Sequence, residues 1–217
     1  MASNKSGTKG LEIELKYLLS RQDYRTLIRN FRRKICKTVY HTNIYFDDSK
    51  LRLRKKHIGL RVRFLNGNRA IVTLKHPAKK KTAKVPSLKI RHEYEEEIPY
   101  RLAKKIIRRR AHLRDLDILP MRVLKRFYDD KLISRIRPLG AVETVRTFVK
   151  HRAGLELELD KFEMFRQKHY ELEVETEKPK QADASVRELF RELGIPYHPI
   201  TKSKLGRFIQ EWRRRRA

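Results

Sequence analysis

Two segments near opposite ends of the chain alternate strictly between charged and aliphatic residues. The first reads Glu-Ile-Glu-Leu-Lys at residues 12–16, and the second reads Glu-Leu-Glu-Val-Glu at residues 171–175. A period of two is typical of a β-strand with one apolar and one polar face. Successive carboxylates on one strand face stand about 7 Å apart, so they repel each other unless a cation lies between them. The chain is therefore expected to be rich in β-structure and to carry charge along a strand face.

The rest of the chain supplies further strands with helices between them. Asn66-Gly67-Asn68 joins two alternating runs and predicts a tight hairpin. The residue patterns predict about eight strands, at 11–19, 39–46, 60–65, 69–74, 87–98, 142–150, 155–162 and 169–176. They predict helices at about 21–36, 99–112, 124–132, 184–193 and 203–215.

Composition sets the size of the fold and the chemistry of its partners. The 217 residues are enough for one domain, expected over residues 11–217 after a flexible basic tail at 1–10. Lys and Arg number 55 against 26 Asp and Glu, which gives a formal net charge of +29. Such an excess repels itself unless anions bind or screen it. The expected partners are therefore nucleic acid, polyphosphate, nucleotides or anionic lipid.

The single cysteine and the histidines exclude several kinds of site. Cys36 has no partner for an internal disulfide, which favours the cytoplasm or another reducing compartment. Its position predicts a small buried residue on the helix at 21–36. No histidine pair has the helical spacing of a metal site, so carboxylates are the expected metal ligands. The sequence contains neither an apolar run long enough to span a membrane nor the apolar core of a secretory signal.

The charged strand faces allow two architectures. An open sheet would expose the charges to water, whereas a closed barrel would enclose them and turn its aliphatic faces toward covering helices. In a closed barrel, Glu12, Glu14, Glu171 and Glu173 could face one another and bind a hard cation such as Mg²⁺ or Mn²⁺. Basic residues on strands between them would suit phosphate oxygens. These are Arg61, Arg63, Lys75, Arg91 and Arg146.

Several further motifs occur in a fixed order along the chain. They include Tyr45-Phe46-Asp47, Leu60-Arg61-Val62-Arg63, Thr73-Leu74-Lys75, Arg91-x-Glu93-x-Glu95, Leu159-Asp160, Tyr170-Glu171-Leu172-Glu173 and Ser203-Lys204. Together with Glu12-x-Glu14-x-Lys16, this ordered set resembles the CYTH, or triphosphate tunnel metalloenzyme, family. Within that family the chain is most similar to the small single-domain inorganic triphosphatases.

The resemblance implies an α+β fold built on an eight-stranded antiparallel closed β-barrel, with covering helices and a C-terminal plug helix. It also implies hydrolysis of a terminal phosphoanhydride with Mg²⁺ or Mn²⁺. The implied metal ligands are Glu12, Glu14, Glu171 and Glu173, and the implied substrate-binding residues are Lys16, Arg61, Arg63, Arg91 and Arg146. Lys75 and Lys204 would be catalytic. Glu93, Glu95, Glu158 and Asp160 would line the tunnel wall and complete a second metal site.

The residues leave the substrate open among several triphosphates. Inorganic tripolyphosphate needs only charged groups, whereas thiamine triphosphate should also need an aromatic contact, and Gly59 precedes the Leu60-Arg61 pair. A cyclase would need an adenine site, which the sequence does not indicate. RNA 5′-triphosphatase activity and a catalytically inactive polyphosphate- or RNA-binding module are the remaining alternatives. Basic clusters at Lys79–Lys81, Arg108–Arg110 and Arg213–Arg216 are either solvated surface or a docking face for polyphosphate or RNA.

Overall fold

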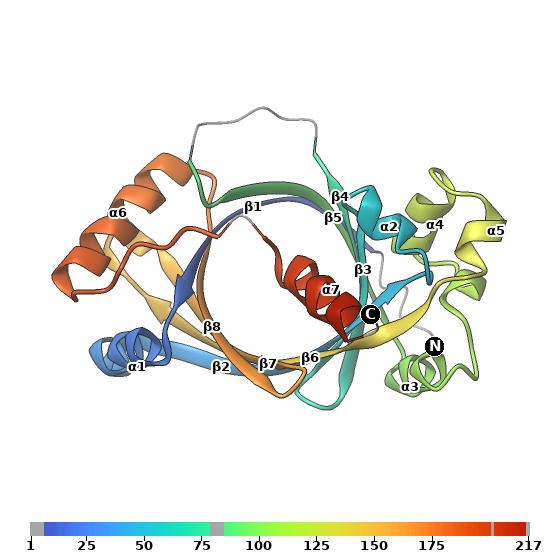
Figure 1. The fold of residues 1–217 in the computed structure, drawn as a ribbon, viewed down its shortest axis with the longest axis horizontal. Helices are drawn as coiled ribbons and strands as arrows, with labels where there is room; N and C mark the ends of the chain where they lie inside the picture. The colour runs from blue at the N-terminus through green and yellow to red at the C-terminus, as the bar shows by residue number, and fades with distance from the viewer. Residues whose placement is uncertain (1–6, 79–84, 201, 216–217) are drawn as a thin grey trace. The chain divides into compact units, whose positions relative to one another are not determined.

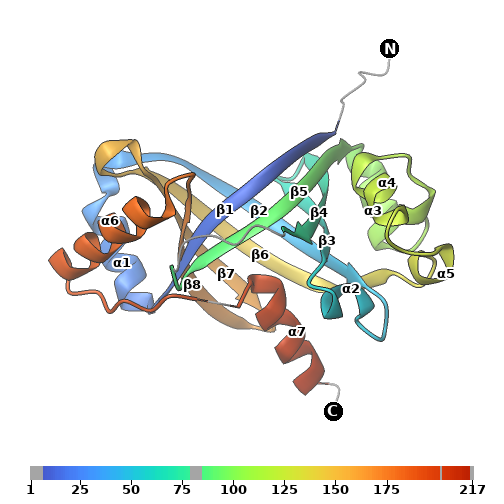
Figure 2. The ribbon, with the colours of Figure 1, turned by 90° about the horizontal axis from the view of Figure 1, so that it is seen from above.

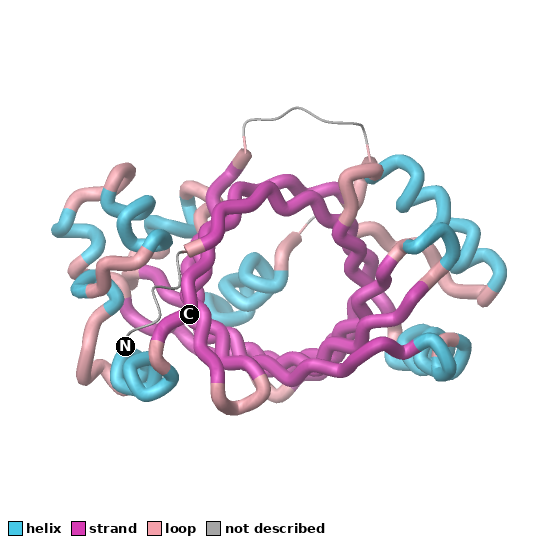
Figure 3. The backbone as a smooth tube through the Cα atoms, turned by 180° about the vertical axis from the view of Figure 1, so that it is seen from behind, coloured by secondary structure: helices cyan, strands magenta, loops and turns pink. Residues whose placement is uncertain are grey.

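The strands close into a single antiparallel barrel. A computed structural model describes residues 7–78, 85–200 and 202–215. The strands are β1 (Thr8–Leu19), β2 (Ile35–Asp47), β3 (Gly59–Leu65), β4 (Arg69–Pro77), β5 (Leu88–Ile98), β6 (Arg137–Lys150), β7 (Glu156–Met164) and β8 (Gln167–Glu175). Their order around the barrel is β1-β5-β4-β3-β2-β6-β7-β8, with the strands in magenta in Figure 3. The predicted eight-stranded closed barrel is confirmed.

Helices fill the connections between the strands. They are α1 (Arg21–Asn30), α2 (Arg52–Lys55), α3 (Tyr100–Ile107), α4 (Leu119–Lys125), α5 (Asp130–Ile133), α6 (Pro179–Glu192) and α7 (Lys204–Arg214). Ser20 begins α1 with a capping box, in which its hydroxyl accepts a hydrogen bond from the Asp23 amide and the Asp23 carboxylate accepts one from the Ser20 amide. No helix within the described residues is long and apolar enough to cross a membrane.

The chain divides into two compact units, each with its own apolar cluster. Within the described residues, the first unit consists of residues 7–11, 41–78 and 91–142, and the second of residues 12–40, 85–90, 143–200 and 202–215. In the first unit, α3, α4 and α5 lie together beside β4 and β5 (Figure 2). Their apolar side chains, among them Ile106, Met121 and Leu132, share one buried cluster with Val62 and Leu74 of the strands.

In the second unit, α1 and α6 cover the apolar face of β7 and β8 (Figure 1). Leu27 of α1 and Phe190 of α6 are buried with Leu159 and Leu172 of the strands. Leu159 and Leu172 are direct cross-strand neighbours. Because side chains alternate along a strand, this packing leaves Glu158, Asp160, Glu171 and Glu173 on the opposite face.

The β3–β4 hairpin forms where the sequence predicts it. Asn66 and Gly67 both have positive φ, at 45° and 79°. Glycine adopts this conformation without steric cost, which is why the tight turn lies at this position.

Several predicted boundaries are wrong. The single helix predicted over 124–132 is two short helices, α4 and α5, and β2, β6 and α6 each begin earlier than predicted. The helix predicted over 21–36 ends at Asn30, and a single 3₁₀ turn at Arg32–Lys34 leads into β2, so Cys36 is exposed on a strand. The helix predicted to reach residue 112 ends at Ile107, because Arg109 has a φ of 59°. The strand predicted from residue 11 begins at Thr8, inside the expected tail. At the starts of β1 and β2, pairing with strands distant in the sequence outweighs the local tail-like and helical patterns.

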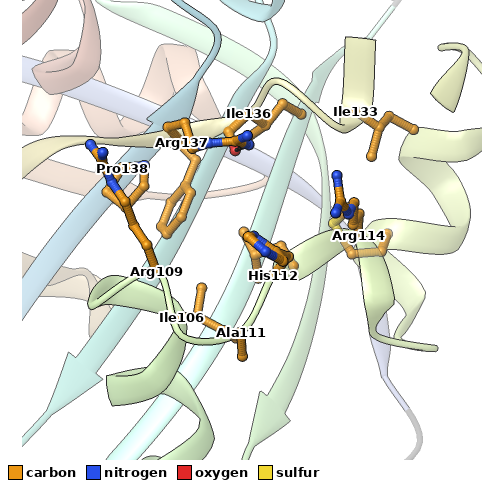
Figure 4. Close-up of a pocket in the computed structure, with 12 residues that line it drawn as sticks. Ile106, Arg109, Ala111, His112, Arg114, Ile133, Ile136, Arg137 and Pro138 are labelled. Carbon is orange, nitrogen blue, oxygen red and sulfur yellow. Dashed lines mark hydrogen bonds between the residues drawn. The ribbon is translucent and has the colours of Figure 1, made fainter. Parts of the chain in front are cut away.

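A small cavity lies between α3, α4 and the chain leading into β6. Arg109, His112, Arg114 and Arg137 are among the residues around it (Figure 4). Its volume of about 20 Å³ is enough for a single water molecule. It is too small to hold a substrate.

Candidate active site and metal centre

The charged face of β7 and β8 is organised by strand register. Glu173 of β8 lies directly opposite Lys16 of β1 on one side and Glu158 of β7 on the other. Two residues away along each strand, and on the same face, Glu171 of β8 is paired with Asp160 of β7. Directly opposite residues share a face and have their Cβ atoms about 5 Å apart. The register therefore brings together charged side chains from strands at both ends of the sequence, as the two acidic segments predict.

Three buried carboxylates meet on this face. Asp160, Glu171 and Glu173 each offer one oxygen, and the three oxygens lie within 4.8 Å of one another. The exposed fractions of these residues are 0%, 0% and 5%. Three carboxylates that are this close together and shielded from water need compensating positive charge. Oxygen ligands of this kind match Mg²⁺ and Mn²⁺, so the group could hold a metal ion.

Lysines from β1 and α7 reach the same carboxylates. The Lys16 Nζ lies 2.9 Å from Glu14 Oε2 and 2.7 Å from Glu173 Oε1. The Lys204 Nζ lies 2.5 Å from Asp160 Oδ2 and 3.0 Å from Glu171 Oε2, and it also contacts Glu173. Both lysines are buried. Their ammonium groups therefore partly neutralise the negative charge of the three carboxylates.

The guanidinium group of Arg146, on β6, contacts carboxylates on both β7 and β8. Its Nε and Nη2 each lie 2.7 Å from an oxygen of Asp160, and Nη2 lies 2.7 Å from Glu173 Oε2. It also pairs with Glu158. A planar guanidinium suits such a bidentate contact, and the same geometry would suit phosphate oxygens.

Burial and these contacts shift the acidity of the whole group. Burial alone would raise the pKa of Glu173, but Lys16, Lys204 and Arg146 outweigh it and hold that pKa well below its usual range. Burial raises the pKa of Glu158 to about 7, against the opposing effect of Arg146. Burial alone would lower the pKa of Lys204, and the neighbouring Asp160 and Glu173 raise it instead. At neutral pH, Asp160 and Glu173 are therefore ionised, and Lys16, Arg146 and Lys204 carry their positive charge.

The start of α7 positions Lys204. The Ser203 hydroxyl accepts a hydrogen bond from the Gly206 amide and fixes the first helical turn. Phe208 of the same helix stacks on Phe165 of the β7–β8 turn, with ring centroids 4.9 Å apart. Arg207, one turn after Lys204, pairs with Glu171. Arg207 is not among the predicted site residues, although its spacing of three from Lys204 places both on one helix face.

A second charged cluster belongs to the first unit. Arg61 of β3 lies opposite Thr73 of β4, which in turn lies opposite Glu95 of β5. The Thr73 hydroxyl donates to Glu95 at 2.6 Å, and the Arg61 Nη2 lies 3.4 Å from Glu93 Oε1. The Lys75 Nζ lies 3.2 Å from Glu93 Oε1. The predicted basic residues Arg61 and Lys75 thus meet the predicted wall carboxylates.

The remaining predicted site residues make other contacts, and they do not belong to the three-carboxylate group. Arg63 donates through Nε to Asn43 Oδ1 at 3.0 Å. Glu14 pairs with Lys16, and Glu12 lies two residues earlier on the same strand. Neither Glu12 nor Glu14 belongs to the three-carboxylate group, whose third member is Asp160. Arg91 of β5 lies opposite Pro77, and its side chain forms no ion pair or hydrogen bond among the residues that the structure describes.

Comparisons with known proteins agree with this fold. The CYTH domain family model matches residues 10–209. The chain is 24% identical over 208 residues to the "Putative triphosphatase YjbK" of Bacillus subtilis, covering 94% of this chain and 97% of that protein. It is also similar to a solved "Putative adenylyl cyclase" from Hippeastrum, described as having a dominant triphosphatase activity. The two are 26% identical with a TM-score of 0.78, over 92% of this chain and 96% of that one.

A second solved structure, of a "putative adenylate cyclase" from Bacillus halodurans, has the same fold. It has 24% identity and a TM-score of 0.75, over 92% of this chain and 98% of that one. The closed barrel with its charged strand motifs is the fold that this chain shares with these proteins. This chain belongs to the CYTH domain family.

Proposed function

We propose that this protein is a divalent-metal-dependent triphosphatase that hydrolyses inorganic tripolyphosphate to pyrophosphate and phosphate. The observation that carries the proposal is the buried group of Asp160, Glu171 and Glu173 set among fixed cations. A surface that only binds anions has no use for three desolvated carboxylates, because they would repel the ligand. A site that binds a polyanion through a metal ion needs both charges.

The carboxylates would hold Mg²⁺ or Mn²⁺, with Asp160, Glu171 and Glu173 as the nearest ligands. Glu12, Glu14 and Glu158 remain proposed contributors from the adjoining strand positions. A bound divalent cation would neutralise phosphate oxygens and favour ionisation of the attacking water. No metal preference follows from three oxygen donors, which suit both ions.

The cations of the chain would hold the phosphate groups. Lys16 and Lys204 are buried beside the carboxylates, and the Arg146 side chain there is 15% exposed. Their ion pairs fix this positive charge in place before substrate arrives. Such preorganised charge stabilises the negative charge that develops on the leaving pyrophosphate. In the reaction, a water oxygen bonds to the terminal phosphorus and the bridging P–O bond breaks. The first-unit residues Arg61, Arg63, Lys75 and Arg91 are proposed to bind phosphate too, with Glu93 and Glu95 positioning Arg61 and Lys75.

Tripolyphosphate is proposed over organic triphosphates because charged groups dominate the proposed site. Gly59, the first residue of β3, offers no aromatic ring beside Arg61 for a thiamine or a base. Long polyphosphate or RNA is proposed as a surface ligand of the exposed basic residues at Arg108–Arg110. Of the other two clusters, Lys79–Lys81 and Arg216 lie outside the described residues.

We further propose that residues 11–217 act as one CYTH domain, in agreement with the family match over residues 10–209. A reducing compartment such as the cytoplasm is proposed from the single cysteine, which can form no internal disulfide.

The decisive experiment is phosphate release from tripolyphosphate, thiamine triphosphate, ATP and triphosphorylated RNA. Each substrate should be tested with Mg²⁺, with Mn²⁺ and with a chelator. We expect tripolyphosphate to give the highest kcat/KM and the chelator to abolish turnover. A higher kcat/KM for thiamine triphosphate or RNA would replace the proposed substrate, and turnover in chelator would contradict the metal role.

A further inference from the structure

A groove of about 960 Å³ lies on the second unit, apart from the carboxylate group. It is lined by the end of β1 and the first turn of α1, by β7 and β8, and by the segment that joins α6 to α7. The lining side chains that matter here are Arg21, Arg25, Lys161 and Lys168. We call this the α1 groove. Its volume is at the upper end of the range for ligand sites, which is about 300–1,000 Å³.

The charges around the α1 groove are strongly unbalanced. The lining contains four cationic side chains and one carboxylate, Asp23, which gives it a formal net charge of +3. Asp23 is itself engaged in the capping box, where it accepts a hydrogen bond from the Ser20 amide. The amino end of α1 opens on the same groove and adds the positive end of the helix dipole.

None of the four cations forms an ion pair or hydrogen bond through its side chain within the described part of the chain. The strand register places Lys168 opposite Glu163, but no ion pair joins them. The basic end of α7 is different, because Arg214 and Arg215 both pair with Glu211. Those contacts lower the pKa of Glu211 to about 2. Unpaired cations gathered around one hollow can therefore bind an external anion without first breaking internal contacts.

The chemistry of the lining favours an inorganic phosphate chain over nucleic acid. Single-stranded nucleic acid binds through cations combined with aromatic faces on which bases stack. The two tyrosines of the groove, Tyr24 and Tyr170, pack against each other with ring centroids 5.1 Å apart. Neither therefore offers a free platform on both faces. A groove with several separated cations can also contact more phosphate groups than a single phosphate ion supplies.

We propose that the α1 groove is a second anion site that binds inorganic oligophosphate chains. The site is separate from the proposed hydrolytic centre, and binding there does not require hydrolysis. Phosphate oxygens would contact Arg25, Lys161 and Lys168, and Arg21 would add charge at the amino end of α1.

The test measures binding of medium-chain inorganic polyphosphate in a chelator, so that no turnover occurs. The groove variant carries Arg25→Gln, Lys161→Gln and Lys168→Gln. The matched control carries Lys178→Gln, Lys180→Gln and Arg191→Gln, which remove the same charge from exposed positions at or near α6. Isothermal titration calorimetry at several salt concentrations gives Kd and its salt dependence.

We expect the groove variant to weaken the affinity by about tenfold or more and to lower the slope of log Kd against log salt by about 2. The control should change both quantities far less. Equal losses in the two variants would overturn the proposal and leave only the general excess of charge. Tighter binding of single-stranded RNA than of polyphosphate, with loss in the same groove variant, would overturn the proposed ligand. Unchanged thermal unfolding and unchanged turnover of tripolyphosphate in the groove variant would separate this result from a folding defect and from the proposed function.

Discussion

The ammonium group of Lys204, at the first position of α7, lies 2.5 Å from the carboxylate of Asp160 in the middle of β7. Both side chains are buried. The two residues are 44 positions apart in the sequence, and the chain between them includes the whole of β8 and α6. The last helix of the chain therefore supplies a counterion to the candidate metal ligands. A cation bound at the carboxylates and the Lys204 ammonium would repel each other at this distance.

Replacing Lys204 should separate metal binding from catalysis. We expect Lys204→Met to tighten binding of Mn²⁺ in the absence of substrate, because it removes a competing charge. Two unit charges 4 Å apart interact by about 4 kcal/mol at an effective dielectric constant near 20. A tenfold change in Kd requires only about 1.4 kcal/mol, so the Mn²⁺ Kd should fall by at least about tenfold. Turnover of tripolyphosphate should fall by roughly 10²–10³-fold, because a preorganised phosphate contact is lost.

Electron paramagnetic resonance of free Mn²⁺ would give the Kd without reference to activity. Lys202→Met is the matched control, because Lys202 is exposed and, within the described residues, its side chain bonds to Gln210 alone. Weaker Mn²⁺ binding in the Lys204 variant would show that Lys204 does not oppose the metal ion.

Glu173 is the carboxylate whose loss should be most damaging to activity. It contacts Lys16, Arg146 and Lys204, and it belongs to the three-carboxylate group. We expect Glu173→Gln to reduce turnover by several orders of magnitude and to weaken Mn²⁺ binding. Glu163→Gln, at an exposed position of β7, should do neither. Circular dichroism and thermal unfolding would confirm the fold, and near-normal turnover at saturating metal would exclude Glu173 as a ligand.

The strand faces of the site could be predicted from sequence because they depend on local alternation. Glu171 and Glu173 are two residues apart, so they share a face wherever β8 lies. The register is a non-local property, and it is the register that places Lys16 beside Glu173 and Asp160 beside Glu171. The family resemblance implied only a place for Asp160 on the tunnel wall and in a second metal site, whereas cross-strand pairing makes it the third member of the carboxylate group.

The errors have the same physical origin. Ile35 and Cys36 continue a helical pattern, but the chain leaves the helix at Asn30 and they begin the long strand β2. Arg207 was missed because its role depends on where α7 docks, which no local pattern reveals. The metal identity, the substrate and the roles of Glu12 and Arg91 stay predictions.

A buried hydrogen-bond centre distant from the carboxylate group should control acid stability. The Asp183 carboxylate accepts hydrogen bonds from Tyr17 Oη at 2.7 Å, Tyr197 Oη at 2.6 Å and Arg187 Nε at 2.8 Å. Burial alone would raise the pKa of Asp183, but these three donors outweigh it and lower that pKa below its reference value of 3.8. A lowered pKa contributes stability above the unfolded-state value, and this stability is lost as pH falls through the folded-state value.

We expect Asp183→Asn to lower the free energy of unfolding at neutral pH by about 1–3 kcal/mol, because charge-assisted hydrogen bonds are lost. The variant should also lose less stability than wild type on acidification below the reference value of 3.8. Urea unfolding at neutral and acidic pH measures both. Asp117→Asn is the control, since the Asp117 side chain is 86% exposed. An unchanged acid dependence in the Asp183 variant would assign the acid sensitivity to other carboxylates.

Removing the exposed charge at the end of α3 should leave catalysis unchanged while weakening attraction to long polyanions. Arg108, Arg109 and Arg110 follow the last turn of α3, are exposed and have no ion pair within the described residues. Exposed charges are screened within about 10 Å at 0.1 M salt, whereas buried ones such as Lys204 are screened much less. Replacing the three arginines by glutamine should therefore weaken binding of long polyphosphate at low salt and have little effect at high salt.

The kcat on tripolyphosphate should stay close to that of wild type, because the short substrate would be held by the buried cations. Parallel titrations of long polyphosphate and turnover assays at low and high salt measure the two effects. Arg29, Arg32 and Arg33 form a matched control, because they are also exposed and change the net charge equally when replaced by glutamine. Equal weakening by both variants would mean that the α3 cluster attracts polyanions only through the overall charge of the protein. A lower kcat in the α3 variant alone would instead give these arginines a part in binding the triphosphate.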